Sequence, residues 1–145
     1  MQTPVWFDKQ QQVSGITGFA GTMIEWLGIS FTALGPDWLE GTMPVDHRTH
    51  QPYGRLHGGA SLVLAETLGS TAGMLAVDPA KFAVAGAEIN GNHLRPVYSG
   101  SVRGVATAEM LGRSTQVWSV RIFDEAQKLI CISRLTLAVF PRDRV

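Results

Sequence analysis

Glu66 stands out for its chemistry because it lies alone in an apolar stretch of the sequence. It is the only Asp, Glu, Lys or Arg between Arg55 and Asp78, so no basic side chain three or four positions away can pair with it on a helix. An isolated buried carboxylate is costly and must find partners elsewhere. Two interpretations stay open: Glu66 reaches solvent at an open edge, or it is a catalytic carboxylate at a subunit interface. Ser70 lies one helical turn further on, where it could hydrogen-bond this carboxylate or a water that Glu66 activates.

Gly58 and Gly59 follow His57 at the start of the same predicted helix. The first turn of a helix presents free N–H groups and the positive end of the helix dipole, and glycines let a ligand approach the backbone closely. Such amides suit the oxyanion that develops in acyl transfer, where one donor lowers the barrier by about 3 kcal/mol. The alternative is that both glycines only shape the turn from loop to helix.

The spacing between Gly58 and Glu66 predicts how these groups are used. Eight residues of helix rise about 12 Å, so the Gly58 N–H and the Glu66 carboxylate of one chain are not expected to bind the same carbonyl group. A site that needs both would be completed by the helix of a two-fold-related chain. This mechanism therefore predicts an obligate dimer.

The helix that positions these residues is expected over residues 58–77. It is apolar on nearly all sides, which is typical of a buried helix. Gly69 and Gly73 each cost about 1 kcal/mol relative to Ala in a helix interior, which indicates that another backbone passes very close to them, as when a helix presses into a sheet.

The remaining elements predict an α+β fold in which a curled antiparallel sheet wraps around the one long helix. Short connections favour antiparallel neighbours, and one helix cannot cover both faces of such a sheet. A short amphipathic helix is expected over residues 4–13 and a polar loop over 46–56. Strands are expected where β-branched and aromatic residues alternate or cluster, over 24–34, 38–45, 82–90, 102–110, 116–123 and 129–140.

Length and composition limit the possible functions. The 145 residues are expected to form one domain, with an N-terminal segment over 1–22 and a core over 24–140. The formal net charge of zero provides no electrostatic footprint for nucleic acid or an anionic membrane. No apolar run reaches the roughly 18 residues that a membrane span needs, no secretion signal is recognisable, and Cys131 is the single cysteine. We therefore expect a cytoplasmic protein with no nucleic-acid or membrane partner.

Two groups of side chains have a simpler interpretation than a functional site. Asp46, His47 and His50 lie in the polar loop without a complementary cluster, so we expect solvated side chains and no metal site. The tryptophans at positions 26, 38 and 118 fall in strand patterns and are expected to be core or interface anchors.

The run from Gln51 to Glu66, QPYGRLHGGASLVLAE, closely resembles the signature of hotdog-fold acyl-CoA thioesterases. Within this family it is similar to the glutamate-using branch that includes the 4-hydroxybenzoyl-CoA thioesterases. In that branch it most resembles the bacterial 1,4-dihydroxy-2-naphthoyl-CoA thioesterases and the enterobactin proofreading thioesterases. The runs TMPVD (42–46), EINGNH (88–93) and QVW (116–118) share this likeness. The resemblance implies the hotdog fold and hydrolysis of an acyl-CoA.

The resemblance also implies roles for individual residues. Glu66 matches the catalytic carboxylate of the family, which acts as a nucleophile or as a general base on water. Gly58 matches the backbone N–H that polarises the thioester carbonyl, with the side-chain amide of Gln51 as the second donor. His57 matches a histidine that orients groups at this site, and Ser70 matches a Ser or Thr that positions the water or the acid.

Further matches concern the substrate and the assembly. Five residues match positions that bind the substrate or coenzyme A, namely Tyr53, His93, Arg95, Arg113 and Ser114. No cofactor is expected, because coenzyme A is part of the substrate. The implied partners are an aromatic or medium-chain acyl-CoA and a second copy of the chain, in a homodimer that forms the active site and pairs into a homotetramer. Menaquinone biosynthesis is the pathway that the resemblance suggests.

Two other functions handle the same ligands. A hotdog hydratase or dehydratase also acts on acyl thioesters, but its signatures place the catalytic His or Asp differently and do not match the run from Gln51 to Glu66. A non-catalytic acyl-CoA binding protein would not need an acid at position 66, and the intact set of residues argues against it. The fold alone does not decide between these functions.

Overall fold

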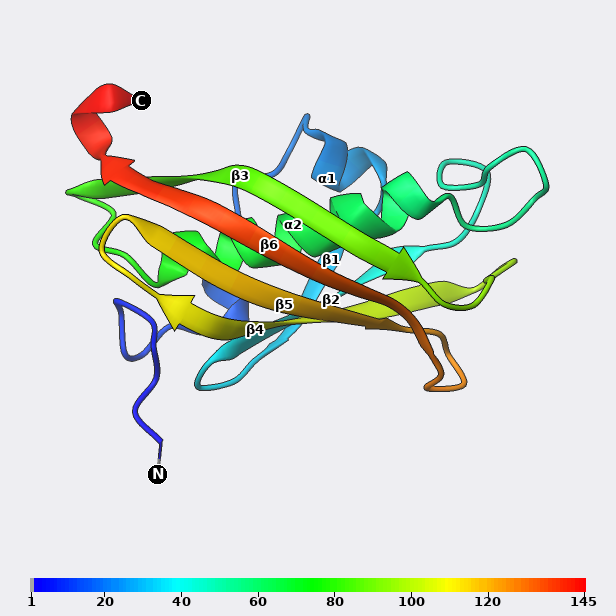
Figure 1. Cartoon of the computed structure of the whole chain (residues 1–145), viewed down its shortest axis with the longest axis horizontal. Coiled ribbons are helices and arrows are strands. Elements are labelled where there is room, and N and C mark those ends of the chain that lie inside the picture. Colours follow the sequence, from blue (N-terminus) through cyan, green and yellow to red (C-terminus); the bar gives the residue numbers. More distant parts are fainter. Residues whose placement is uncertain (1) are drawn as a thin grey trace.

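A computed structural model describes residues 2–145, in which one long helix lies across one face of a six-stranded antiparallel sheet (Figure 1). The helix, α2, spans Gly58–Leu75 and packs against every strand from β2 to β6. The strands, in their order across the sheet, are β1 (Ser30–Leu34), β2 (Trp38–Pro44), β4 (Ser101–Leu111), β5 (Thr115–Phe123), β6 (Leu129–Pro141) and β3 (Phe82–His93). The smaller elements are the helical turn α1 (Met23–Trp26) and the 3-10 turns η1 (Val13–Gly15) and η2 (Arg142–Arg144). Strands β1 and β3 therefore form the two edges of the sheet.

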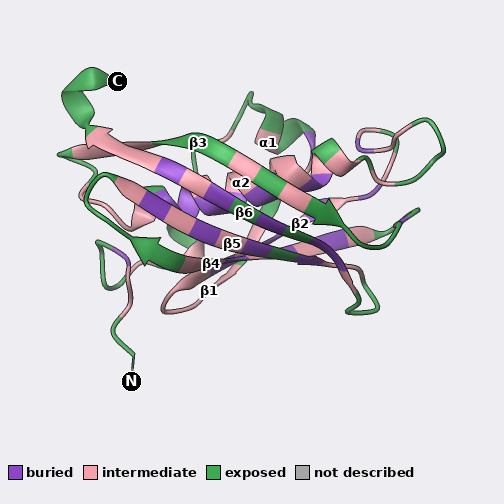
Figure 2. Ribbon diagram, in the orientation of Figure 1, coloured by how far each residue is buried: buried purple, intermediate pink, exposed green. Residues whose placement is uncertain are grey.

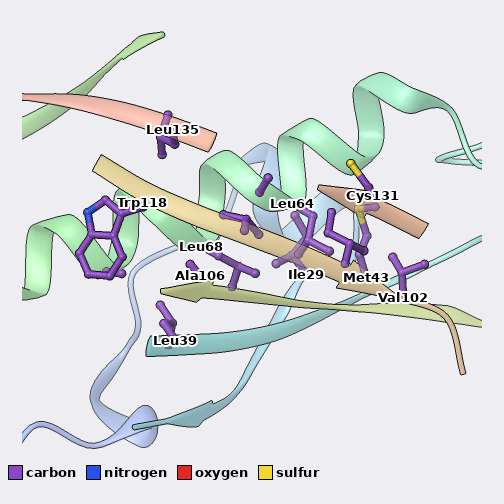
Figure 3. Close-up of a cluster of buried hydrophobic side chains, with 14 of the residues drawn as sticks. Ile29, Leu39, Met43, Leu64, Leu68, Val102, Ala106, Trp118, Cys131 and Leu135 are labelled. Carbon is purple, nitrogen blue, oxygen red and sulfur yellow. The ribbon is translucent and has the colours of Figure 1, made fainter. Parts of the chain in front are cut away.

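The core lies between α2 and the inner face of this sheet (Figure 3). Strands β2, β4 and β5 alternate between fully buried and partly exposed residues, whereas β3 is exposed along most of its length (Figure 2). Leu64 and Leu68 of α2 are completely buried, as is Trp118 of β5. The prediction of a core anchor at Trp118 is therefore confirmed.

The glycines in α2 are explained by packing. A Cβ at Gly69 would lie 2.6 Å from the Cδ2 atom of Leu135 in β6, and a Cβ at Gly73 would overlap the Leu137 side chain of the same strand. The close packing against a sheet that the sequence predicted for Gly69 and Gly73 is confirmed, but the neighbours are side chains of the sheet rather than another backbone. Both glycines let the helix sit against the sheet without a gap, which a well-packed interior requires.

The predicted helix over residues 4–13 is wrong: this stretch forms bends and turns that lead into η1. The cause is Trp6, which is 2% exposed and stacks on Trp118 with ring centroids 6.2 Å apart. The Trp6 Nε1–H donates to the Gly35 carbonyl oxygen at 2.8 Å. Backbone N–H groups of this stretch also donate hydrogen bonds to carbonyl oxygens far away in the sequence, so they are not free to form the hydrogen bonds of a helix.

The strand predicted over residues 24–34 is correct only from Ser30 onward. Its first part forms α1, where the Glu25 carboxylate accepts a hydrogen bond from the Gly21 N–H at 2.6 Å. Gly28, with a φ of 69°, then turns the chain. Trp26 is 72% exposed in the described chain, so it is not a core anchor, and the alternative of an interface anchor stays a prediction. The other strands and α2 begin and end within two residues of their predicted bounds, except that β3 continues to His93. None of the helices in residues 2–145 is long and apolar enough to cross a membrane.

Candidate active site

The structure places four of the five predicted catalytic residues, all except His57, in two separate hollows, which share no lining residue. The first, here called the amide hollow, has a volume of about 290 Å³ and lies where α2 begins and β3 ends. Its lining includes Gln51, Arg55, Gly58, His93 and Arg95. The second, here called the acid hollow, has a volume of about 330 Å³ and lies further along α2. Its lining includes Phe19, Ile24, Glu66, Thr67, Ser70, Thr71, Met74 and Val84.

In the amide hollow, the first turn of α2 leaves one backbone donor unused. His57 caps the helix: its Nδ1 accepts a hydrogen bond from the Gly59 N–H at 2.8 Å, and its carbonyl oxygen accepts from the Ala60 and Ser61 N–H groups. The Gly58 N–H has no acceptor among residues 2–145. Gly58 can therefore donate to a ligand at the positive end of the helix dipole. The structure thus places His57 as the N-cap of this helix rather than in the lining of the hollow.

Gln51 is held by its own turn. Its backbone N–H donates to the Arg55 carbonyl oxygen at 2.8 Å, and its side-chain oxygen accepts a hydrogen bond from the Tyr53 N–H. With the amide oxygen occupied, the side-chain NH₂ group is oriented to donate, and it has no acceptor among residues 2–145. Gln51 lines the same hollow as Gly58, so its NH₂ group is a second candidate N–H donor there.

Basic and aromatic side chains surround these two donors. The His93 ring packs on Gly58, where an added Cβ would lie 2.6 Å from its Nε2 atom. The exposed Arg95 guanidinium donates to the Leu129 carbonyl oxygen at 2.5 Å, and the Arg55 guanidinium lies 6.0 Å from the centre of the Tyr53 ring. Tyr53 is 84% exposed and lies outside the lining of the hollow. Two guanidinium groups at the hollow suit a ligand that carries negative charge.

The acid hollow contains Glu66, whose carboxylate makes no hydrogen bond or ion pair with residues 2–145. The side chain is partly buried, and one of its oxygens lies directly against Gly86 of β3. Ser70 lines the same hollow one turn further along α2, without a hydrogen bond to Glu66. The structure therefore brings Glu66 and Ser70 together and separates them from Gln51 and Gly58.

Arg113 and Ser114 lie in the turn between β4 and β5 and line neither hollow. The Ser114 carbonyl oxygen accepts a hydrogen bond from the Val139 N–H at 2.9 Å, and Val139 is paired with Val84, which lines the acid hollow. This turn is thus at the acid-hollow end of the sheet. Within one chain the structure does not bring these two residues together with His93 and Arg95.

The loop before Gln51 contains an ion pair between Asp46 and Arg48. The Asp46 carboxylate accepts three hydrogen bonds from Arg48, from its backbone N–H, its Nε and one terminal nitrogen, which lies 2.7 Å away. These bonds hold the pKa of Asp46 well below its ordinary value and raise the pKa of Arg48. His50 Nε2 lies 3.0 Å from the Tyr98 carbonyl oxygen. Across residues 2–145, no three His, Cys, Asp or Glu side chains are grouped to hold a metal ion.

Sequence reasoning missed several residues that line the hollows. The apolar lining of the acid hollow comes from Phe19, Ile24, Met74 and Val84, which lie in three segments far apart in the sequence and share no motif. Arg55 could have been predicted from the sequence, because it is a basic residue two positions before His57 in the run that starts at Gln51.

Comparison with known proteins identifies the family. The family model described as Thioesterase superfamily matches residues 53–131, which is more than half of the chain. The proofreading thioesterase EntH of Cronobacter sakazakii is 55% identical over 82% of this chain and 86% of its own length. The 1,4-dihydroxy-2-naphthoyl-CoA hydrolase of Escherichia coli is 53% identical over 82% of this chain and 87% of its own length.

Solved structures agree with these matches. A thioesterase from Haemophilus influenzae superposes with a TM-score of 0.82 at 53% identity, covering 84% of this chain and 85% of the other. A thioesterase from Pseudomonas aeruginosa, solved as a glutamine-to-alanine variant, superposes with a TM-score of 0.83 at 50% identity, covering 83% of this chain and 87% of the other. Hotdog thioesterases are oligomeric and act on acyl thioesters. From its fold and these relatives, the chain belongs to the thioesterase superfamily, as a thioester hydrolase with the hotdog fold.

Proposed function

We propose that the protein hydrolyses an aromatic or medium-chain acyl-CoA to the free acid and coenzyme A, at a site shared between two chains. The observation that carries this proposal is the separation of the two hollows: Glu66 lines one, and the donors Gly58 and Gln51 line the other. Neither hollow alone holds both a carboxylate and a pair of N–H donors. The acid hollow of one chain and the amide hollow of its partner together supply a complete set.

The donors act on the thioester carbonyl. The Gly58 N–H and the Gln51 side-chain NH₂ are both free of acceptors in residues 2–145, so both can donate to the oxygen as it gains negative charge. Donors that are already oriented need no rearrangement during the reaction, which is why such pairs stabilise the transition state. A thioester is electrophilic enough for this polarisation and one carboxylate to suffice.

The Glu66 carboxylate supplies the attack on the polarised carbon in one of two ways. As a nucleophile, it forms a mixed anhydride and expels the coenzyme A thiolate, and water then hydrolyses the anhydride. As a general base, it takes a proton from a water molecule whose oxygen attacks the same carbon, and the tetrahedral intermediate expels the thiolate. We assign the holding of that water or of the acid to Ser70, which lines the same hollow.

The position of β3 supports assembly as a dimer. It is an edge strand with most of its residues exposed in the single chain, and it borders the acid hollow at Val84 and the amide hollow at His93. An unpaired edge is a template for pairing with another strand. If two copies of β3 pair antiparallel about a two-fold axis, the acid-hollow end of each lies beside the amide-hollow end of the other. We extend the proposal to a pair of such dimers.

The lining of the hollows supports the substrate class. The acid hollow offers apolar surface from Phe19, Ile24, Met74 and Val84 in a volume of about 330 Å³, which suits an aromatic ring or a medium-length acyl chain. Arg55 and Arg95 at the amide hollow suit the charged coenzyme A portion. The relative from Escherichia coli is named for an aromatic acyl-CoA, which favours an aromatic substrate and a place in menaquinone biosynthesis. No separate cofactor is needed for this chemistry.

The test is the release of coenzyme A thiol by wild type, Glu66→Gln and Glu66→Ala across aromatic and medium-chain acyl-CoA substrates. A positioned acid or base contributes roughly 100- to 10,000-fold to the rate, so both variants should lose at least the lower of these factors with the fold and oligomeric state unchanged. Retention of wild-type activity by a folded Glu66→Gln oligomer would disprove the proposed mechanism.

A further inference from the structure

Gly86 of β3 lies directly against the carboxylate of Glu66. A Cβ built on Gly86 would come well inside 3.0 Å of the Glu66 Oε1 atom, a separation that real Cβ atoms essentially never show. The next nearest atom is the carboxylate carbon of the same side chain, at 3.4 Å. The space that a side chain would take at position 86 is therefore occupied by the proposed catalytic acid.

The φ angle gives no reason for a glycine at this position. The φ angle of Gly86 lies outside the left-handed region that favours glycine, unlike those of Gly28 and Gly100. A glycine inside a strand weakens the strand, because it loses more backbone freedom on folding and offers no side chain to pack. The group that lies in the space of a side chain at position 86 is the Glu66 carboxylate.

The strand is also irregular at this point. Gly86 is paired with Leu137 of β6 and Glu88 with Thr136, so Ala87 is an extra residue that forms a bulge in β3. Bulges bend a strand locally and are frequent beside active sites, where they change the direction of nearby groups. The bulge and the missing side chain occur together at the point where β3 meets Glu66.

Other glycines in the sheet contact α2 differently. A Cβ at Gly91, also in β3, would meet the Cδ2 atom of Leu62 at 2.6 Å, and one at Gly104 in β4 would meet the Cδ1 atom of Leu68 at 2.7 Å. These neighbours are the ends of flexible apolar side chains, so these two glycines set the packing distance. The neighbour of Gly86 is also the end of a flexible side chain, but it is a carboxylate that makes no hydrogen bond in the described chain.

We propose that Gly86 is a positioning residue for the reaction: the bulged, side-chain-free part of β3 is a seat that fixes how far the Glu66 carboxylate lies from the bound thioester. The inference rests on the proposed function, because it assigns the chemistry to Glu66. A methyl group at position 86 would push the carboxylate out of this seat, and a misplacement of about 1 Å can lower an enzymatic rate about 100-fold.

The first test compares Gly86→Ala with the matched control Gly91→Ala, which adds the same methyl group to the same strand against the same helix but touches Leu62. We expect Gly86→Ala to lower kcat between about 10- and 100-fold with KM changed less than about 3-fold. Gly91→Ala should leave kcat within about 3-fold of wild type. Equal losses of kcat in the two variants would overturn the inference, because they would reflect a general shift of β3 from α2.

A second test separates positioning from folding. In Glu66→Asp the shorter side chain draws the carboxylate back from position 86, so adding Gly86→Ala to this variant should lower kcat by less than about 3-fold. A purely structural role would give the same loss in both backgrounds, and that result would overturn the inference. If Glu66→Gln retains full activity, the proposed function itself fails. If Glu66→Gln is inactive while Gly86→Ala matches wild type, only the role of Gly86 fails.

Discussion

The proposed site shared between two chains predicts how active mixed dimers should be. Glu66→Gln removes the carboxylate from the acid hollow, and Gln51→Ala removes one donor from the amide hollow. Each variant alone alters both sites of its own dimer. A dimer that contains one chain of each kind has one site with both changes and one site with neither, provided that each site takes its acid and its donors from different chains.

The expected activities of the separate variants and of their mixture can be calculated from the loss at each site. Loss of one oxyanion donor costs roughly 100- to 1,000-fold, and loss of the acid roughly 100- to 10,000-fold, so either variant alone should have about 1% of wild-type activity or less. Random reassortment of equal amounts makes half of the dimers mixed, and each mixed dimer has one intact site of its two. The mixture should therefore recover about one quarter of the wild-type rate.

The assay is thiol release after the two variants are unfolded together in denaturant and refolded, with each variant refolded alone as the control. Differently tagged chains allow the mixed species to be purified, and its rate should be about half that of wild type, since one of two sites is intact. If Glu66 and Gln51 of the same chain form the site, no intact site exists in any dimer. Activity no higher than that of the separate variants, in a mixture shown to contain mixed dimers, would refute the shared site.

Three further predictions concern binding and stability. Replacing Arg55 and Arg95 with Gln should raise KM for acyl-CoA more than it lowers kcat. The difference in KM from wild type should shrink at high salt, because salt screens the attraction between charges. Steady-state kinetics at two salt concentrations test this. Trp6→Ala should lower the free energy of unfolding by about 3–5 kcal/mol, measured by urea denaturation, because Trp6 is 2% exposed and stacked on Trp118. Because the pKa of Asp46 is lowered in the folded protein, this carboxylate stabilises the fold at pH values above its ordinary pKa of 3.8, and the stabilisation is lost as the pH falls below that value. Between pH 6 and 3 the urea midpoint of Asp46→Asn should therefore fall less steeply than that of wild type.

Local pattern was enough to predict α2 and most of the sheet. The helix is a long apolar run that ends near a proline, and β2 and β4 to β6 alternate or cluster apolar residues between clear turn signals. The errors lie at the start of the chain. Trp6 is fixed by Gly35 and Trp118, which are far away in sequence, and no local rule foresees that such contacts override a helical pattern.

The candidate site was predictable to a different extent for each residue. The lone charge of Glu66 and the glycine at the start of α2 were visible because each breaks the local composition. The seat at Gly86 was not visible, because a glycine among the small residues of β3 attracts no notice until the neighbouring helix is in place. Which strand contacts a given part of the helix depends on the order of the strands in the sheet. In this order β3 lies at an edge next to β6, although β2 precedes it in the sequence.

The geometry of α2 explains why an acid and an amide donor on one helix require a second chain. The free Gly58 N–H belongs to the first turn of the helix, where the helix dipole favours a bound negative charge, and this effect falls off within that turn. Glu66 must lie further along, where a partly buried face of the helix meets β3 and can hold a carboxylate without a basic partner. A single straight helix cannot bring its own start and middle to one carbonyl group, but two helices related by a two-fold axis can place each start opposite the other's middle. On this argument, dimerisation is a requirement of the proposed chemistry, and a monomeric variant that keeps its fold should bind acyl-CoA poorly and release no thiol.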